Sequence, residues 1–215
     1  MGNRLLQWCA VTAFFLFGLT LPAQANELIV GRDYAVMQPS LPTDNPAKIE
    51  VVEFFSYACP HCSELNPAIT RWAKKLPKDV TFKRVSPGFN PFYKLMARLF
   101  YSLEAIGELE RLDEAVFTAI HVKGLRLIDE NSILEWVKAQ GVDVRQFSDA
   151  FNSFGVAAKA RQADQFSRDA KIQGVPTLII DGRYMVLTQG IHSHEDLLAR
   201  AEKLIDKRRK ERAKK

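Results

Sequence analysis

Residues 49–62 carry the strongest structural signal in the chain and read Ile49-Glu50-Val51-Val52-Glu53-Phe54-Phe55-Ser56-Tyr57-Ala58-Cys59-Pro60-His61-Cys62. The first seven form a nearly continuous apolar run of β-favouring residues, which predicts a buried central strand. A C-x-x-C pair follows the strand, and Pro60 suits the first turn of a helix. Apolar residues then fall on one helical face, at Leu65, Ile69 and Trp72. The cysteine pair therefore lies where a buried strand passes into a helix.

This position favours redox chemistry at the pair. The free N–H groups and partial positive charge of a helix N-terminus stabilise a thiolate at the first cysteine, whose pKa can fall from about 8.5 to roughly 3.5–7.5. His61 between the cysteines can add positive charge or a hydrogen bond. A stabilised thiolate makes the disulfide a stronger oxidant. We expect Cys59 to be the attacked sulfur and Cys62 the buried resolving partner.

Two other interpretations of the pair are weaker. An inert structural disulfide three residues apart closes almost no chain, so it would stabilise the fold little. A structural metal site needs about four ligands, and the histidines at 61, 121, 192 and 194 supply no second ligand pair at a familiar spacing. We expect no metal and no cofactor, and we interpret His192 and His194 as part of a helix N-terminus.

The N-terminus has the form of an export signal. Residues 1–25 hold Arg4, an apolar run over 5–21 and an A-x-A site that places the cut after Ala25. The alternative is an uncleaved membrane anchor. The run is near the lower length limit for spanning a bilayer, and Pro22 next to the small-residue site favours cleavage.

The composition narrows the class of protein. The 215 residues are 47% hydrophobic and 26% charged, which suits one globular domain, or one domain with an insertion. Of the three cysteines, Cys9 leaves with the signal, so the mature chain is not a disulfide-stapled mini-protein. Export also excludes a cytosolic enzyme and places Cys59 and Cys62 in an oxidising compartment.

The net charge of +5 is concentrated at the C-terminal end. Residues 207–215 hold seven bases and one acid and contribute +6, while residues 1–25 contribute +1, which leaves −2 for residues 26–206. A basic tail can bind nucleic acid or an anionic membrane. We favour a solvated, fraying helix end, because no aromatic side chains are interleaved for base stacking.

The remaining pattern predicts the order of elements. Strands are expected at 33–37, 49–55, 80–85, 177–180 and 183–187, the last two joined at Asp181-Gly182 as a hairpin. Helices are expected at 60–75, 92–103 and 109–120. Four more should begin at Asn131 or Ser132, at Asp143, at Ser153 (running to about Ile172) and at Ser193. Removing the central helices leaves β-β-α-β-α-β-β-α, so those helices form an insertion.

Two segments resemble the DsbA family of bacterial periplasmic thiol:disulfide oxidases: Phe54 to Cys62, which ends in C-P-H-C, and Gly174-Val175-Pro176-Thr177 before a strand. The resemblance spans essentially the whole mature chain. It implies an α/β (α+β) thioredoxin fold with an inserted all-helical domain. Residues 26–88 and 162–215 would form the thioredoxin-like part and residues 89–161 the insertion. Thioredoxins usually carry C-G-P-C instead.

The resemblance also implies roles for further residues. Val175 and Pro176 match the loop in which a cis proline faces the disulfide and binds substrate. Glu53 matches a buried acid that relays protons near the resolving cysteine; the alternatives are a partly exposed strand residue or an ion pair with Arg84. Phe89 and Phe92 are candidates for an apolar surface near the disulfide, with core packing favoured for Phe92.

The implied activity is donation of the Cys59–Cys62 disulfide to exported proteins. A substrate thiolate attacks Cys59, and a second substrate thiolate displaces it. A membrane quinone-linked partner of the DsbB type would reoxidise a monomeric enzyme. The alternatives are an exported reductase or isomerase, a binding module with a vestigial disulfide, and nucleic-acid binding through the basic tail.

Overall fold

The computed structural model describes residues 27–214, so the predicted signal at 1–25 lies outside the described residues. The strands are β1 (Tyr34–Val36), β2 (Ile49–Phe54), β3 (Val80–Val85), β4 (Thr177–Ile180) and β5 (Tyr184–Val186). The helices are α1 (Pro60–Ala73), α2 (Pro91–Ala105), α3 (Leu109–Phe117), α4 (Glu130–Ala139), α5 (Val144–Phe151), α6 (Phe154–Asp169) and α7 (His194–Arg212), with a π-helical turn η1 (Thr118–Val122) after α3. None of these helices is long and apolar enough to cross a bilayer.

The five strands form one mixed sheet in the order β1-β5-β4-β2-β3. β2 lies at an inner position, where it pairs in parallel with β3 and antiparallel with β4. All six residues of β2 are buried, as expected for a strand with neighbours on both sides and helices on both faces. This central strand leads directly into the cysteine pair at the start of α1.

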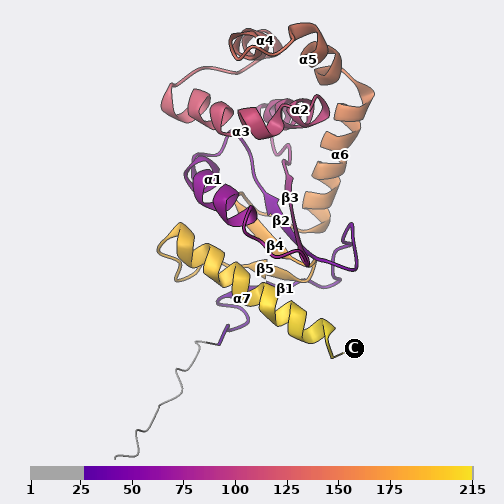
Figure 1. Cartoon of the computed structure of the whole chain (residues 1–215), viewed down its shortest axis with the longest axis vertical. Helices are drawn as coiled ribbons and strands as arrows, with labels where there is room; N and C mark the ends of the chain where they lie inside the picture. The colour runs from indigo at the N-terminus through magenta and orange to yellow at the C-terminus, as the bar shows by residue number, and fades with distance from the viewer. Residues whose placement is uncertain (1–26, 215) are drawn as a thin grey trace, which may run out of the picture.

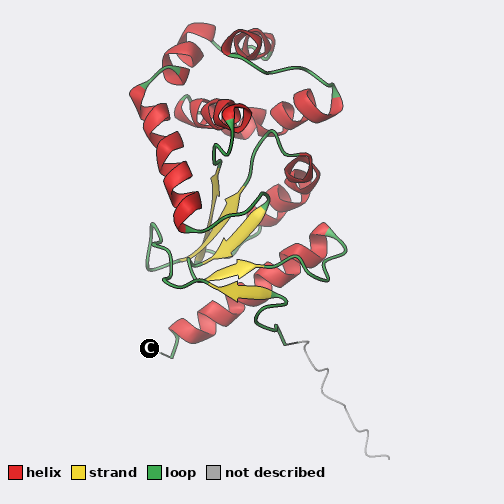
Figure 2. Ribbon diagram, turned by 180° about the vertical axis from the view of Figure 1, so that it is seen from behind, coloured by secondary structure: helices red, strands yellow, loops and turns green. Residues whose placement is uncertain are grey.

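Helices cover both faces of the sheet, and two apolar cores result. α1 and α7 pack on one face, around residues such as Val51 and Ile180. The other face, with Val52 and Phe54, shares a core with the helices that follow β3. Figure 1 shows α7 lying across the sheet below α1, and Figure 2 shows the strands in front of these two helices when the molecule is seen from behind.

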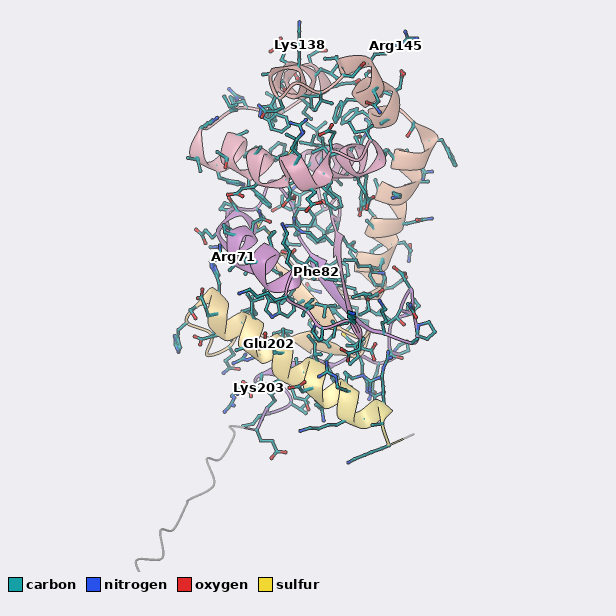
Figure 3. The ribbon with its side chains drawn as sticks, in the orientation of Figure 1. Arg71, Phe82, Lys138, Arg145, Glu202 and Lys203 are labelled. Carbon is teal, nitrogen blue, oxygen red and sulfur yellow. The ribbon has the colours of Figure 1, made fainter. Side chains whose placement is uncertain are left out.

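The helices α2 to α6 all lie between β3 and β4 in the chain, which confirms a thioredoxin-type α+β fold with a helical insertion. Lys138 on α4 and Arg145 on α5 mark the end of this helical block farthest from the sheet (Figure 3). α6 returns toward the sheet and continues past residue 161 to Asp169. The segment before α2 contacts α6 directly, because the Gly88 N–H donates to the Asp164 carboxylate over 2.6 Å.

Most of the predicted helix starts are correct. Asp143, Ser153 and Ser193 each accept a backbone N–H at the start of α5, α6 and α7, respectively. The prediction for α4 was wrong: Asp129 is its N-cap, and Ser132 lies three positions later and closes a reciprocal capping box. α6 ends at Asp169 instead of about Ile172, because the chain turns through Lys171 with φ 54°.

The basic C-terminal segment is part of the fold, so the prediction of a fraying, solvated end was wrong. Asp181 opens the β4–β5 hairpin, and its buried carboxylate pairs with both Arg208 and Arg212 of α7. Arg209 pairs with Asp79 at 2.7 Å. These contacts join the end of α7 to the sheet, and helical order continues to Arg212.

The hairpin turn itself requires glycine at its second position. Asp181 and Gly182 have φ of 54° and 60°, the left-handed conformation, and the Arg183 N–H closes the turn around them by donating to the Ile180 carbonyl at 3.0 Å. A Cβ added at Gly182 would lie 2.2 Å from the carbonyl oxygen of Leu41. The predicted Asp-Gly hairpin is confirmed, and the turn also accepts the Leu41 N–H at the Gly182 carbonyl oxygen over 2.8 Å.

Candidate active site

Cys59 is the N-cap of α1. Its backbone is extended (φ −96°, ψ 118°), and its N–H donates to the Ser56 carbonyl over 3.0 Å. Its Sγ accepts the backbone N–H of Cys62 at 3.4 Å. The cap position normally belongs to Ser, Thr, Asp or Asn, whose side-chain oxygen satisfies a free helix N–H. Here a sulfur does this, and the contact grows stronger when the sulfur is charged.

The two cysteines are free thiols in this structure, and their pKa values are shifted in opposite directions. A hydrogen bond from the Cys62 side chain lowers the pKa of Cys59 to about 6, helped by the backbone N–H groups of Cys62 and His61 and by the His61 charge, and opposed by burial. The hydrogen bond given to Cys59 and burial raise the pKa of Cys62 well above its usual range. At neutral pH Cys59 is therefore the nucleophilic thiolate and Cys62 a protonated thiol.

The cysteine with the lowered pKa, Cys59, is also the more exposed of the two. Cys59 retains 4% of its surface in contact with solvent, and Cys62 retains none. The Cys59 thiol also lies 3.3 Å from the carbonyl oxygen of Val175, in the loop that precedes β4. An incoming sulfur can thus reach Cys59 only, at the edge between α1 and the Val175 loop.

His61 projects into solvent beside the pair, with 79% of its side chain exposed. Its Nδ1 lies 3.1 Å from Glu64, one turn along α1. The hydrogen bond and charge of Glu64, and then the charge of Cys59, raise the pKa of His61. A protonated His61 in turn favours the Cys59 thiolate, so the two groups stabilise each other's charged form.

The 174–177 loop approaches the cysteines from the start of β4, and its Val175–Pro176 peptide bond is cis. Pro176 lines a groove of about 560 Å³ together with His61, Leu65, Ile191 and residues 192–195, which lead into the first turn of α7. The sequence linked Pro176 and His61 to the cysteines, but it gave no reason to place His192 and His194 in the same groove. They reach it because α7 packs beside α1.

Phe89 and Phe92 are 47% and 37% exposed at the start of α2. The expectation of core packing for Phe92 was therefore wrong. Phe92 continues the apolar spacing of α2, but it lies in the first turn, before the buried stretch that begins at Met96. Phe89 packs against Tyr93, with 5.8 Å between the ring centroids.

A buried charge cluster lies under the pair. Glu53 is fully buried, and its Oε2 accepts the Arg84 Nε–H at 2.8 Å. Arg84 also donates through Nη1 to both oxygens of Asp113 on α3, each at 2.8 Å, and the Tyr57 hydroxyl donates to Asp113 at 2.7 Å. Burial raises the pKa of Glu53, the Arg84 charge lowers it, and the charge of Asp113 raises it again.

Three residues of this region were not predicted from the sequence: Tyr57, Asp113 and His121. Tyr57 is fully buried between Phe55 and Phe117. His121 of η1 bonds through Nε2 to the Tyr57 carbonyl oxygen at 2.8 Å. Asp113 and His121 lie more than 50 residues from the C-x-x-C segment in the chain, and no local pattern shows that α3 and η1 fold against it.

Comparisons with known proteins agree with this geometry. The profile of the DSBA-like thioredoxin domain matches residues 66–199. The thiol:disulfide interchange protein DsbA of Bordetella parapertussis is 40% identical over 183 residues, 85% of each chain. The protein of that name from Pseudomonas syringae pv. tomato is 38% identical over 210 residues, 97% of each chain. The crystal structure of Pseudomonas aeruginosa DsbA superposes with a TM-score of 0.83 at 33% identity, covering 89% of this chain and 99% of that one.

The fold, the capped thiolate and these relatives lead to one assignment. A C-P-H-C pair at a strand-to-helix junction, with one activated sulfur, is suited to thiol:disulfide exchange. The similarity to the relatives extends over nearly the whole length of the chain. The chain belongs to the DsbA family and is a protein thiol:disulfide oxidoreductase.

Proposed function

We propose that the protein works in the bacterial periplasm as a disulfide donor to newly exported proteins. The observation that carries this proposal is the asymmetry of the pair: the pKa of Cys59 is lowered to about 6, whereas that of Cys62 is raised. Stabilising the Cys59 thiolate stabilises the reduced enzyme and therefore makes its disulfide easier to reduce. Such a pair gives its disulfide away more readily than it acts as a reductant.

The proposed reaction has two exchange steps. A substrate thiolate attacks Cys59 Sγ, which forms a substrate–Cys59 disulfide, breaks the Cys59–Cys62 bond and releases Cys62 with the electron pair. A second substrate thiolate then attacks the substrate sulfur of the mixed disulfide, and Cys59 leaves as the stabilised thiolate. The products are an oxidised substrate and the reduced dithiol enzyme.

Neighbouring residues have supporting roles in this proposal. Pro60 starts α1 where its missing N–H costs nothing, and His61 supplies positive charge near Cys59. Val175 and Pro176 bind the substrate backbone opposite Cys59. Glu53 acts as the proton donor to Cys62 when Cys62 leaves, because the acid is buried beneath the pair and the charges of Glu53 and Cys62 interact.

The partners and location complete the proposal. Residues 1–25 direct export and are cleaved after Ala25. A membrane quinone-linked protein of the DsbB type takes the electrons from the reduced enzyme, which acts as a monomer. We further propose that residues 26–88 and 162–215 act as the thioredoxin-like domain and residues 89–161 as the helical domain, with no metal or cofactor.

The test is to trap the intermediate and to follow the direction of exchange. Residues 26–215 carrying Cys62→Ser should form a mixed disulfide with an oxidised peptide, whereas Cys59→Ser should form little, because Cys62 is buried and protonated. The oxidised wild-type protein should oxidise a reduced two-cysteine peptide in one turnover. Slow oxidation combined with fast reduction of insulin would contradict the oxidase and indicate a reductase. Biological activity that survives Cys59→Ser would indicate a binding module.

A further inference from the structure

Arg84 is shared between two acids that come from different parts of the fold. Glu53 on β2 receives one N–H, from Nε at 2.8 Å. Asp113, on α3 of the helical block, receives Nη1 through both of its oxygens at 2.8 Å. The side chains of Glu53, Arg84 and Asp113 are 0%, 12% and 15% exposed, so solvent screens this cluster little. Two acids therefore share one guanidinium in a largely buried site.

The geometry shows that Glu53 pairs with Arg84 less completely than Asp113 does. Arg84 and a carboxylate form their strongest pair when two N–H groups meet two oxygens. Glu53 has only one such bond, because its Oε1 and the Nη2 of Arg84 are both buried with no hydrogen-bond partner among the described residues. The guanidinium is also held over the Phe55 ring, 3.7 Å from its centroid. Asp113 also accepts the Tyr57 hydroxyl at 2.7 Å, so its carboxylate is held by a second partner besides Arg84.

The charges facing Glu53 come from every element around it. They are Arg84 on β3, Asp113 on α3, and Cys59 and Cys62 at the start of α1, with the Tyr57 hydroxyl in the loop between β2 and α1. Burial and the Asp113 charge raise the pKa of Glu53, while Arg84 lowers it. In this set Asp113 adds its own negative charge and also holds Nη1 of the guanidinium that Glu53 shares, so its two effects have the same sign.

We propose that Asp113 is a positioning residue for the redox site, which keeps Glu53 in its proton-carrying form by holding Arg84 away from a full pairing with it. The inference rests on the proton-donor role of Glu53 proposed above. When a substrate thiolate attacks Cys59, the Cys59–Cys62 bond breaks and Cys62 leaves as a thiolate. The Glu53 carboxyl gives its proton to that thiolate, which yields a Cys62 thiol and a Glu53 carboxylate, and the carboxylate then regains a proton from solvent. The helical block would thereby set the protonation state of an acid in the sheet.

The experiment uses Asp113→Asn, which removes the charge and keeps an oxygen that accepts from Arg84 and Tyr57. The protonation of Glu53 in the oxidised protein is followed directly by the ¹³C shift of its carboxyl group across a pH series. We expect the Glu53 midpoint to move to lower pH in the variant, because Arg84 becomes free to neutralise Glu53. Single-turnover oxidation of a two-cysteine peptide is measured over the same series. At each pH above the Glu53 midpoint, the rate of Asp113→Asn relative to wild type should fall by the same factor as its fraction of protonated Glu53.

Matched variants separate positioning from general damage. Glu114→Gln removes the same charge from the next, exposed position of α3 and should leave both curves unchanged. Asp113→Glu should restore the wild-type midpoint, and Asp113→Ser provides a second charge-removing variant should the asparagine variant fail to fold. In a Glu53→Gln background, Asp113→Asn should no longer change the pH profile of the rate, because the group on which it acts is gone.

Two results would overturn the inference at different points. A Glu53 midpoint that does not move in Asp113→Asn would show that Asp113 does not control Glu53, whatever Glu53 does. A midpoint that moves while the rate profile stays fixed would remove the proton-donor role of Glu53, and with it any consequence of Asp113 for catalysis.

Discussion

Reduction of the disulfide should give the protein a pH-dependent stability that the oxidised form lacks. The folded pKa of Cys59 is about 6, whereas a cysteine in an unfolded chain has a pKa of about 8.5. Because the folded value is the lower one, the unfolded chain binds more protons between the two values, and stability rises with pH there. The contribution is fully present above the unfolded pKa and is lost as the pH falls through about 6.

The magnitude follows from the same two pKa values. One pKa unit corresponds to about 1.36 kcal/mol, so the reduced protein should gain about 2 kcal/mol in its free energy of unfolding between pH 6 and pH 8. Solvent at the edge of the groove screens part of the interaction, so this is an upper figure. Cys62 adds nothing below the unfolded pKa, because its raised pKa keeps it protonated in the folded protein.

The assay is urea unfolding of the reduced and oxidised proteins at half-unit steps over this range. Subtracting the oxidised curve removes the titrations that both forms share, such as the pairing of His61 with Glu64, and leaves those that depend on the Cys59 charge. Cys59→Ser, which has no thiol at this position, should show no rise relative to the oxidised wild-type protein. A difference between reduced and oxidised protein that stays flat from pH 6 to pH 8 would refute the thiolate argument.

Further predictions concern the hairpin and the end of α7. Gly182→Ala should lower the free energy of unfolding by about 2 kcal/mol or more, because its Cβ would meet the Leu41 carbonyl oxygen at 2.2 Å and φ is positive. Gly174→Ala, where a Cβ meets nothing within 4 Å, is the control, and equal losses would contradict the steric argument. Asp181→Asn should cost about 2 kcal/mol or more, since it removes the buried partner of Arg208 and Arg212. The control is Asp206→Asn, which removes the exposed pair of Asp206 with Arg209 and should lower the free energy of unfolding by less than about 1 kcal/mol. A loss as large as that of Asp181→Asn would contradict the stabilising role assigned to the buried Asp181 pairs.

Local signals explain why the redox pair could be predicted from the sequence. The strand before Cys59, the proline after it and the helical spacing beyond it all depend on residues close in the chain. The same holds for Asp143, Ser153 and Ser193, whose side chains cap helices that begin at the next residue. The α4 start was misplaced because Asp129 and Ser132 both have capping side chains, and only the backbone conformation decides between them.

Tertiary contacts explain what the sequence could not show. The partner of Arg84 on α3, Asp113, is 29 positions away, and its choice depends on how the helical block folds back. The basic residues at 208 and 212 looked solvated because their partner, Asp181, lies in the hairpin 27 to 31 positions earlier. Phe92 matched the apolar spacing of α2, but periodicity alone does not show where along a helix its neighbours end.

The contacts of Tyr57 show how the inserted helical block supports the redox site. Tyr57 directly precedes the Ala58–Cys59 step, and it is held by Asp113 of α3 through its hydroxyl and by His121 of η1 through its carbonyl oxygen. The loop that presents Cys59 is thus fixed from the side of the insertion as well as from the sheet. Preorganisation of this kind keeps an attacked sulfur within reach of a substrate without a rearrangement.

The reduction potential of residues 26–215, measured by equilibration with glutathione and thiol alkylation, tests the central claim most directly. Because the pKa of Cys59 is lowered to about 6, the thiolate is stabilised and the potential should lie on the oxidising side of thioredoxin, toward the value of about −120 mV given by DsbA. A potential near about −270 mV, the value of thioredoxin, would contradict the account and make the protein an exported reductant.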